Sequence, residues 1–135
     1  MFNEQEAINE YGFYAHYVYE TEGNREFNGL ANLHTHGLKE SFNHMDLQLV
    51  IPINMQTASG LFHTVAKNIK KGKTYQAGKL YDDVIRNYFV KFENFTDKGR
   101  PVLRMILPDE KGFFPGDREC SGIYRRQTEV LRYEE

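Results

Sequence analysis

The sequence predicts a single α+β domain spanning residues 1–135, built on an antiparallel or mixed sheet of about five strands with helices packed mainly on one face. Three observations predict this fold class. Several segments are rich in aromatic and β-branched residues or alternate apolar with polar side chains, which is typical of strands. One long segment has the apolar spacing of an amphipathic helix. Strands are expected both before and after that helix, an order typical of an α+β fold, and no internal repeat or linker divides the chain.

The N-terminal third of the chain predicts a hairpin. Residues 3–10 are expected to form a short polar helix or a frayed end. Nearly all residues of Phe13–Glu20 are aromatic, β-branched or small, which predicts a first strand. A second strand, Leu30–Thr35, is expected to pair with the first around a polar turn at Gly23-Asn24. The segment Gly37–Asn43 that follows is predicted to be a loop.

The middle of the chain predicts a buried strand and the main helix. Asp46–Ile53 is the most apolar run, so it predicts a central strand covered on both faces, with Pro52 marking the end of its pairing. A helix is expected over Met55–Lys71, with Asn54 as N-cap and Gly72 just beyond its C-terminus. Its apolar residues recur at helical spacing and predict one buried stripe: Ala58, Leu61, Phe62, Val65 and Ile69.

The C-terminal half predicts a second hairpin. Tyr75–Arg86 fits a short helix, or a loop with an irregular strand. Asn87–Phe95 alternates in the manner of a half-exposed strand, and Asp97-Lys98-Gly99 is a turn that leads into a return strand at Pro101–Leu107. The tail, Ser121–Arg132, has weak helical character.

Composition limits the classes of partner. The 17 basic and 19 acidic residues give a net charge of −2, whereas a main partner of nucleic acid calls for a clustered basic excess. Cys120 is the single cysteine, so the chain cannot form a disulfide within itself. No apolar run approaches the ~18 residues that cross a membrane, and Met1–Glu10 lacks the basic and apolar regions of a signal peptide. We therefore expect a cytoplasmic protein whose partner is neither nucleic acid nor membrane.

One histidine-rich segment could carry chemistry. His34 and His36 lie two residues apart at the end of the second predicted strand, so their side chains point to the same side. His44 and Asp46 lie beyond the next loop and could complete a ligand set for zinc or another divalent metal. His16, on the first strand, is a further candidate ligand. The other interpretation is that these histidines satisfy backbone groups near strand ends.

A shallow cleft is expected beside this segment. Gly37 tolerates a sharp exit from the second strand, and a folded-back loop would place His44 near His36, with Tyr14 and His16 at the border. A second candidate contact site is Phe113-Phe114, two large apolar residues in a Gly- and Pro-rich loop. These rings either fold back onto the core, which we favour, or present an apolar surface to a ligand or partner.

Two stretches of the chain are similar to the motifs of a known family. Leu33–Leu38 followed by His44–Leu47 is similar to an aromatic-Thr-x-Gly-Leu motif, a short loop and His-Pro-Glu-Leu. In this sequence His34 stands in place of the aromatic residue and Met45-Asp46 in place of Pro-Glu. Pro108–Pro115 is similar to the later motif Pro-Asp-x-x-Gly-x-Phe-Pro.

Other positions extend this similarity along most of the chain. Tyr11-Gly12-Phe13 falls where members of the family carry a Gly-aromatic opening, and Gln127 matches a glutamine after the late motif. The order and spacing of these segments resemble the bacterial domain-of-unknown-function family number 4262. The resemblance implies a bacterial, cytoplasmic α+β domain and no particular activity. It adds weight to four positions that the fold or a site would need: Gly37, His44, Pro108 and Asp109.

The residues favour a non-enzymatic binding domain for a protein partner or a small ligand, because no complete catalytic constellation is present. The alternative is a metal-dependent hydrolase that uses His34, His36, His44 and Asp46. A further alternative is an immunity or regulatory protein that neutralises an intracellular partner. No cofactor is expected except a divalent metal ion at the histidines.

Overall fold

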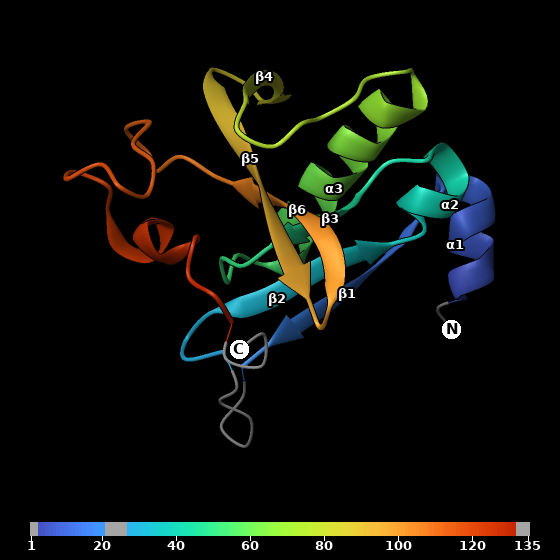
Figure 1. Cartoon of the computed structure of the whole chain (residues 1–135), viewed down its shortest axis with the longest axis horizontal. Helices are drawn as coiled ribbons and strands as arrows, with labels where there is room; N and C mark the ends of the chain where they lie inside the picture. Colours follow the sequence, from blue (N-terminus) through green and yellow to red (C-terminus); the bar gives the residue numbers. More distant parts are fainter. Residues whose placement is uncertain (1–2, 21–26, 132–135) are drawn as a thin grey trace.

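A computed structural model describes residues 3–20 and 27–131 of the chain, and its centre is one mixed sheet of six strands (Figure 1). The strands are β1 (Tyr14–Tyr19), β2 (Ala31–His36), β3 (Asp46–Leu49), β4 (Leu80–Ile85), β5 (Tyr88–Asp97) and β6 (Arg100–Ile106). The helical elements are α1 (Glu4–Tyr11), α2 (Leu38–Phe42), α3 (Met55–Lys70) and the short 3₁₀ helix η1 (Gly122–Arg126).

The spatial order of the strands is β1-β2-β3-β6-β5-β4. The central pair β3–β6 is parallel and the other four pairs are antiparallel, so two antiparallel units meet in the middle of the sheet. The predicted first hairpin is confirmed, with Tyr14 opposite His36. The sixth strand is β4, which lies in the segment for which a short helix was the first interpretation. The local sequence pattern fits either a helix or a strand, and the pairing with β5 makes this segment a strand.

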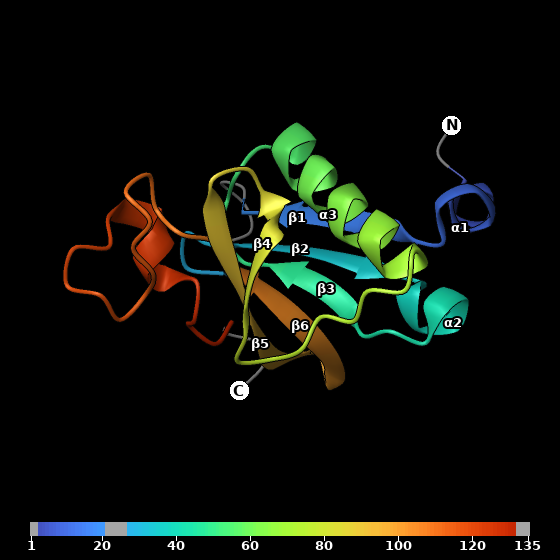
Figure 2. The same ribbon diagram turned by 90° about the horizontal axis from the view of Figure 1, so that it is seen from above.

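The helix α3 covers one face of the sheet (Figure 2). Its predicted bounds are confirmed to within one residue, and Asn54 caps it by accepting a hydrogen bond from the Thr57 amide. The stripe expected to be buried is buried at Ala58, Phe62, Val65 and Ile69, whereas Leu61 is partly exposed. These side chains share one apolar core with Leu33, Leu47, Leu49, Val90, Phe92, Leu103 and Met105 of the strands.

The segment Gly37–Asn43, predicted to be a loop, contains the helix α2, and this correction has a local cause. Gly37 has a φ of 107°, which only glycine adopts without strain, and so the chain turns directly from β2 into the helix. The Leu38 amide, which lacks a partner within so short a helix, donates to the carboxylate of Asp46. A helix of five residues is too short to show an apolar period.

Two further boundaries differ from the sequence expectation. The strand predicted at residues 46–53 ends at Leu49, because the chain then makes a tight turn in which the Ile53 amide donates to the Ile51 carbonyl. Within residues 121–131, the described part of the weakly helical tail, η1 is the only helix. The expected turn at Gly23-Asn24 lies outside the described residues. None of the helices in the described part of the chain has the length and apolar character that crossing a membrane requires.

The segment after β6 lies at one end of the sheet and α1 and α2 lie at the other (Figures 1 and 2). The carboxylate of Asp109 organises this segment by accepting hydrogen bonds from the amides of Lys111, Phe113 and Ser121. Gln127 anchors it to β6, since its side-chain amide bonds to both the N–H and the carbonyl of Leu107. These contacts explain why the late motif and its glutamine are needed by the fold.

Candidate functional site

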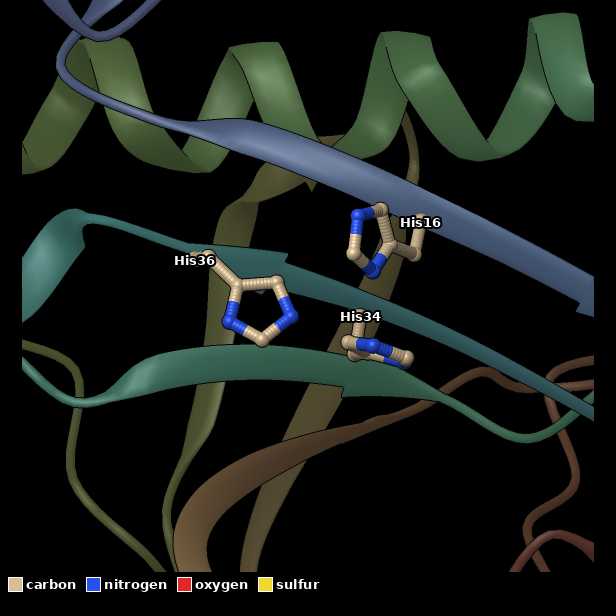
Figure 3. A group of neighbouring side chains, drawn as sticks. All are labelled: His16, His34 and His36. Atoms are coloured by element: carbon tan, nitrogen blue, oxygen red, sulfur yellow. The ribbon is translucent and has the colours of Figure 1, made fainter. Parts of the chain in front are cut away.

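The face of the sheet opposite α3 carries a cluster of three histidines. Leu33 belongs to the apolar core, so its neighbours along β2, Asn32 and His34, point to the other face together with His36. His16 of β1 lies directly across from His34 in the strand register. Figure 3 shows the three rings gathered beside one another over β1 and β2, on the side of the sheet away from the helix.

The spacing of these rings would allow all three to bind one metal ion after small rotations. Around a tetrahedral ion with Zn–N distances of about 2.0–2.1 Å, ligand nitrogens lie roughly 3.3 Å apart and ring centres about 5 Å apart. The ring centroids are separated by 5.4 Å for His16–His34, 4.9 Å for His16–His36 and 5.0 Å for His34–His36. One nitrogen of each ring lies within 4.8 Å of those of the other two. Small ring rotations therefore bring all three to ligand distance.

His34 is already oriented for this role. Its Nδ1 lies 3.0 Å from the side-chain oxygen of Asn32 and 3.8 Å from the carboxylate of Asp97, which leaves Nε2 as the atom available to an ion. Burial lowers the pKa of His34 to about 4, although Asp97 acts in the opposite direction. Burial, assisted by Arg100, also lowers the pKa of His36. Both rings are therefore neutral at pH 7, the form that binds metal.

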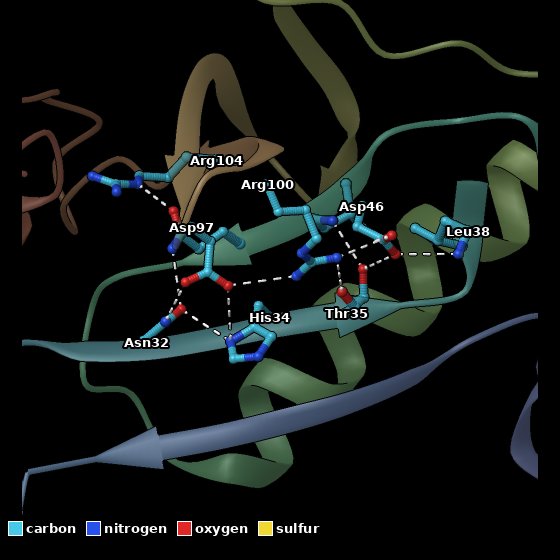
Figure 4. A network of polar contacts seen from close by, with 10 residues as sticks. Asn32, His34, Thr35, Leu38, Asp46, Asp97, Arg100 and Arg104 are labelled. Carbon is cyan, nitrogen blue, oxygen red and sulfur yellow. Dashed lines mark hydrogen bonds and ion pairs between the residues drawn. The ribbon is translucent and has the colours of Figure 1, made fainter. Parts of the chain in front are cut away.

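Arg100 joins two buried carboxylates at the edge of the cluster (Figure 4). Its guanidinium lies 3.2 Å from Asp46 and 3.5 Å from Asp97, and it donates to the Thr35 carbonyl at 3.0 Å. Asp46 also accepts hydrogen bonds from the Thr35 hydroxyl and the Leu38 amide. Burial raises the pKa of Asp46, and these donors oppose that effect. Since all these partners are donors or cationic, Asp46 is held as a carboxylate.

A chain of buried polar groups continues from the histidines across the sheet. The Asn32 side-chain oxygen accepts from Gln48, whose own oxygen accepts from Nε of Arg104 at 2.8 Å. Arg104, which is fully buried, also donates to the carbonyls of Gln127 and Glu129. The cluster is therefore connected through side chains to the segment that follows β6.

Two clefts meet at His36 and Arg100. The first, which we call the histidine cleft, has a volume of about 410 Å³ and is lined by His16, Val18, Phe27, Asn32, His34, His36, Asp97, Lys98 and Arg100. The second, which we call the helix cleft, has a volume of about 480 Å³ and is lined by Ile8, Tyr14, His36, Gly37, Lys39, Glu40, Met45, Asp46, Arg100 and Pro101. Because the two share a wall, one small molecule can contact both.

In the described part of the chain, the other candidates from the sequence do not belong to this group of three rings. Both ring nitrogens of His44 are used by the backbone, Nδ1 against the Met45 carbonyl at 2.9 Å and Nε2 accepting from the Tyr75 amide at 3.0 Å. Asp46 is occupied by its donors. Tyr14 stacks on His36 with ring centroids 5.2 Å apart and lines the helix cleft. Phe113 and Phe114 are both half-buried in the loop after β6.

Sequence reasoning missed Asn32, Asp97 and Arg100. Asp97 and Arg100 flank the turn between β5 and β6, and the sequence pattern at this place predicted only the turn. Their charges reach the histidines because the parallel pairing of β3 with β6 brings that turn beside β2, a contact between residues more than sixty positions apart. Besides His34 and His36, the residues that could be placed in advance were His16 and Tyr14, from the expected hairpin pairing.

The fold and this face define a mixed-sheet α+β domain with a histidine-lined cleft. The chain belongs to the family described as Domain of unknown function (DUF4262), whose family model matches residues 7–121. The resemblance drawn from the two motifs is thereby confirmed. A search among curated proteins and a search among solved structures each found no match.

Proposed function

We propose that this protein is a metal-dependent binding domain, in which His16, His34 and His36 hold one divalent transition-metal ion and leave a coordination position open toward the histidine cleft. The observation that carries the proposal is the triangle of ring centroids with sides of 4.9, 5.0 and 5.4 Å. Imidazole ligands suit zinc, copper, iron and nickel, and three protein ligands with one free position are typical of a site that also binds a small molecule.

The charges around the rings favour a cation. Arg100 contributes one positive charge, and Asp46 and Asp97 contribute two negative ones, so these three buried or half-buried groups leave one negative charge beside the cluster. Glu4, on α1, adds a carboxylate 3.4 Å from Nε2 of His16. This carboxylate can orient the ring as an outer partner.

The ligand set proposed here differs from the set expected from sequence. His16 takes the place of His44, whose nitrogens are occupied, and Asp46 acts through Arg100 and not on the metal. The binding role comes from the open position and the adjoining clefts.

Metal uptake by single-histidine variants tests the proposal. The protein is stripped with a chelator and titrated with Zn²⁺ or Co²⁺. We expect one ion per chain, and His16→Ala should weaken binding by more than the roughly 10–100-fold that losing an outer partner costs. His16 is exposed, so this variant keeps the fold. The matched control is His63→Ala, which removes an exposed histidine of α3 outside the cluster.

Two results would overturn the proposal. One is the absence of stoichiometric uptake by the folded wild-type protein. The other is an equal loss of affinity in His16→Ala and His63→Ala, which would place any bound ion elsewhere. Unfolding midpoints measured in the presence of chelator separate loss of metal from loss of fold.

A further inference from the structure

Resting on the proposed metal site, we infer that the ligand of this domain is a small monoanion, a carboxylate with a compact apolar body, whose oxygen takes the open metal position while its body lies in the helix cleft. Arg100 and the lining of the helix cleft are not needed as metal ligands and are available to a ligand.

The charge balance selects a monoanion. Without a metal ion, Arg100, Asp46 and Asp97 leave one negative charge, and a divalent ion held by neutral imidazoles converts this to one positive charge. The other charged groups that line the clefts or touch the cluster are Lys39, Lys98, Glu40 and Glu4, and their two positive and two negative charges cancel in the sum. Since a partly buried site is most stable when neutral, a single negative charge completes it, whereas a dianion overshoots.

Arg100 can assist the ligand carboxylate but is not free to bind a phosphate alone. Its Nη1 is committed to Asp46 and the Thr35 carbonyl, while its Nη2 has a longer contact of 3.5 Å with Asp97. Its side chain is 29% exposed, and the residue lines both clefts. A carboxylate oxygen beside the metal would gain a charge-assisted hydrogen bond from this group.

The helix cleft has an apolar lining that can contact the apolar part of the ligand. Ile8 of α1, Tyr14 of β1, Met45 and Pro101 contribute apolar surface on its different sides, and His36 forms the common wall with the metal site. Tyr14 stacks on His36, so a body in this cleft lies against the rim of the aromatic pair. A ligand with a charged end and an apolar end therefore satisfies both clefts, whereas a bare inorganic anion would leave the second one empty.

Binding of four small probes to the Co²⁺-loaded protein tests this inference through the visible absorption of the metal. Benzoate should change the spectrum saturably. Acetate, which lacks the body, should bind about tenfold more weakly. Benzamide, a neutral isostere, and inorganic phosphate should bind more weakly than benzoate.

Ile8→Ala should lower the affinity for benzoate about three- to tenfold while that for acetate stays unchanged. The matched control, Ile123→Ala, removes an exposed isoleucine outside the cleft and should change neither.

Failure of the metal site and failure of the monoanion ligand give different results in these experiments. If the protein takes up no Co²⁺, the proposed metal site and this inference fall together. If Co²⁺ binds with the expected histidine dependence and benzoate leaves its spectrum unchanged, the metal site stands and the monoanion is wrong. Tighter binding of phosphate than of benzoate overturns the charge argument, and equal affinities for benzoate and acetate overturn the helix cleft as the place of the body.

Discussion

The two faces of the sheet are built from the same strands but by different means. On the face toward α3, Leu33, Leu47 and Leu49 have no exposed surface and pack against Phe62, so stability comes from apolar area. On the opposite face, residues of the same two strands, Asn32 and Gln48, are also buried, but each is held by a specific hydrogen-bond partner.

The polar face is the part of this small domain where chemistry can reside. Apolar packing is non-directional, so one side chain can shift and its neighbours partly compensate. A buried polar network depends on every partner, and it holds its groups in defined orientations. The histidine cluster lies on the polar face, where Asn32 and Asp97 orient His34. The apolar face supplies the stability that allows the other face to bury polar groups.

Truncation of the apolar core should have the largest effect. Phe62 is fully buried against the strands, so Phe62→Ala should lower the free energy of unfolding by about 3–5 kcal/mol. Chemical denaturation measures this change. Leu61→Ala, at the partly exposed position next to it, is the control and should cost clearly less. An unchanged midpoint for Phe62→Ala would show that α3 does not stabilise the sheet through this stripe.

The most informative single residue of the polar face is Arg104. Replacing it with methionine keeps an apolar stem over the Phe95 ring but leaves the Gln48 oxygen and two backbone carbonyls without their donor. We expect a loss of about 2–3 kcal/mol, since buried acceptors without donors are costly. Arg125→Met, at an exposed position, should change stability by less than about 0.5 kcal/mol. Equal effects of the two substitutions would mean that the network contributes little to stability.

The contrast between the faces also explains what the sequence could predict. The apolar spacing of α3 repeats over sixteen residues, so the sequence predicted both the position of this helix and its buried face. The helix α2 and the strand β4 were not, because the first is too short to show a period and the second depends on pairing with β5. The HxH spacing placed His34 and His36 on one side of β2. The partners of the site could not be read, since Asp97 and Arg100 reach it only through the order of strands in space.

Acid should destabilise the metal-free protein through the polar face. His34 has a pKa of about 4 in the folded protein against an ordinary value of 6.5, because burial and the charges of His16, His36 and Arg100 outweigh Asp97. The unfolded chain therefore takes up a proton first. The stability that this contributes is complete above pH 6.5 and is lost as the pH falls toward about 4.

The expected loss over this range is roughly 2–3 kcal/mol for the single histidine. Urea denaturation in the presence of a chelator, at about pH 7 and about pH 4.5, measures it as the difference between wild type and His34→Gln. The variant removes this titration and should show the shallower pH dependence, while carboxylates that do not contact His34 affect both proteins alike. Parallel pH profiles for the two proteins would contradict the assigned burial of His34.

The smallest expected effect is the loss of stability when a helix N-cap is removed. This loss should differ between α3, on the apolar face, and α1, at the end of the sheet beside the helix cleft. Both helices begin with an asparagine cap: Asn54 accepts from the Thr57 amide at 2.8 Å, and Asn3 accepts from the Glu6 amide at 3.0 Å. Asn54→Ala should lower global stability by about 1 kcal/mol, because α3 unfolds only with the core. Asn3→Ala should lower it by less than about 0.5 kcal/mol, since Ala7 is the only buried residue of α1 and this helix can open locally.

Urea unfolding and amide hydrogen exchange together check this last prediction. Asn3→Ala should speed exchange within α1 while the urea midpoint stays near that of the wild type, and Asn54→Ala should shift the midpoint. Equal losses of global stability would show that α1 belongs to the cooperative core. The expected outcome bears on binding, because α1 contributes Ile8 to the helix cleft and Glu4 to the surroundings of His16. A helix that opens separately from the core lets this side of the cleft adjust to a ligand without loss of the apolar face.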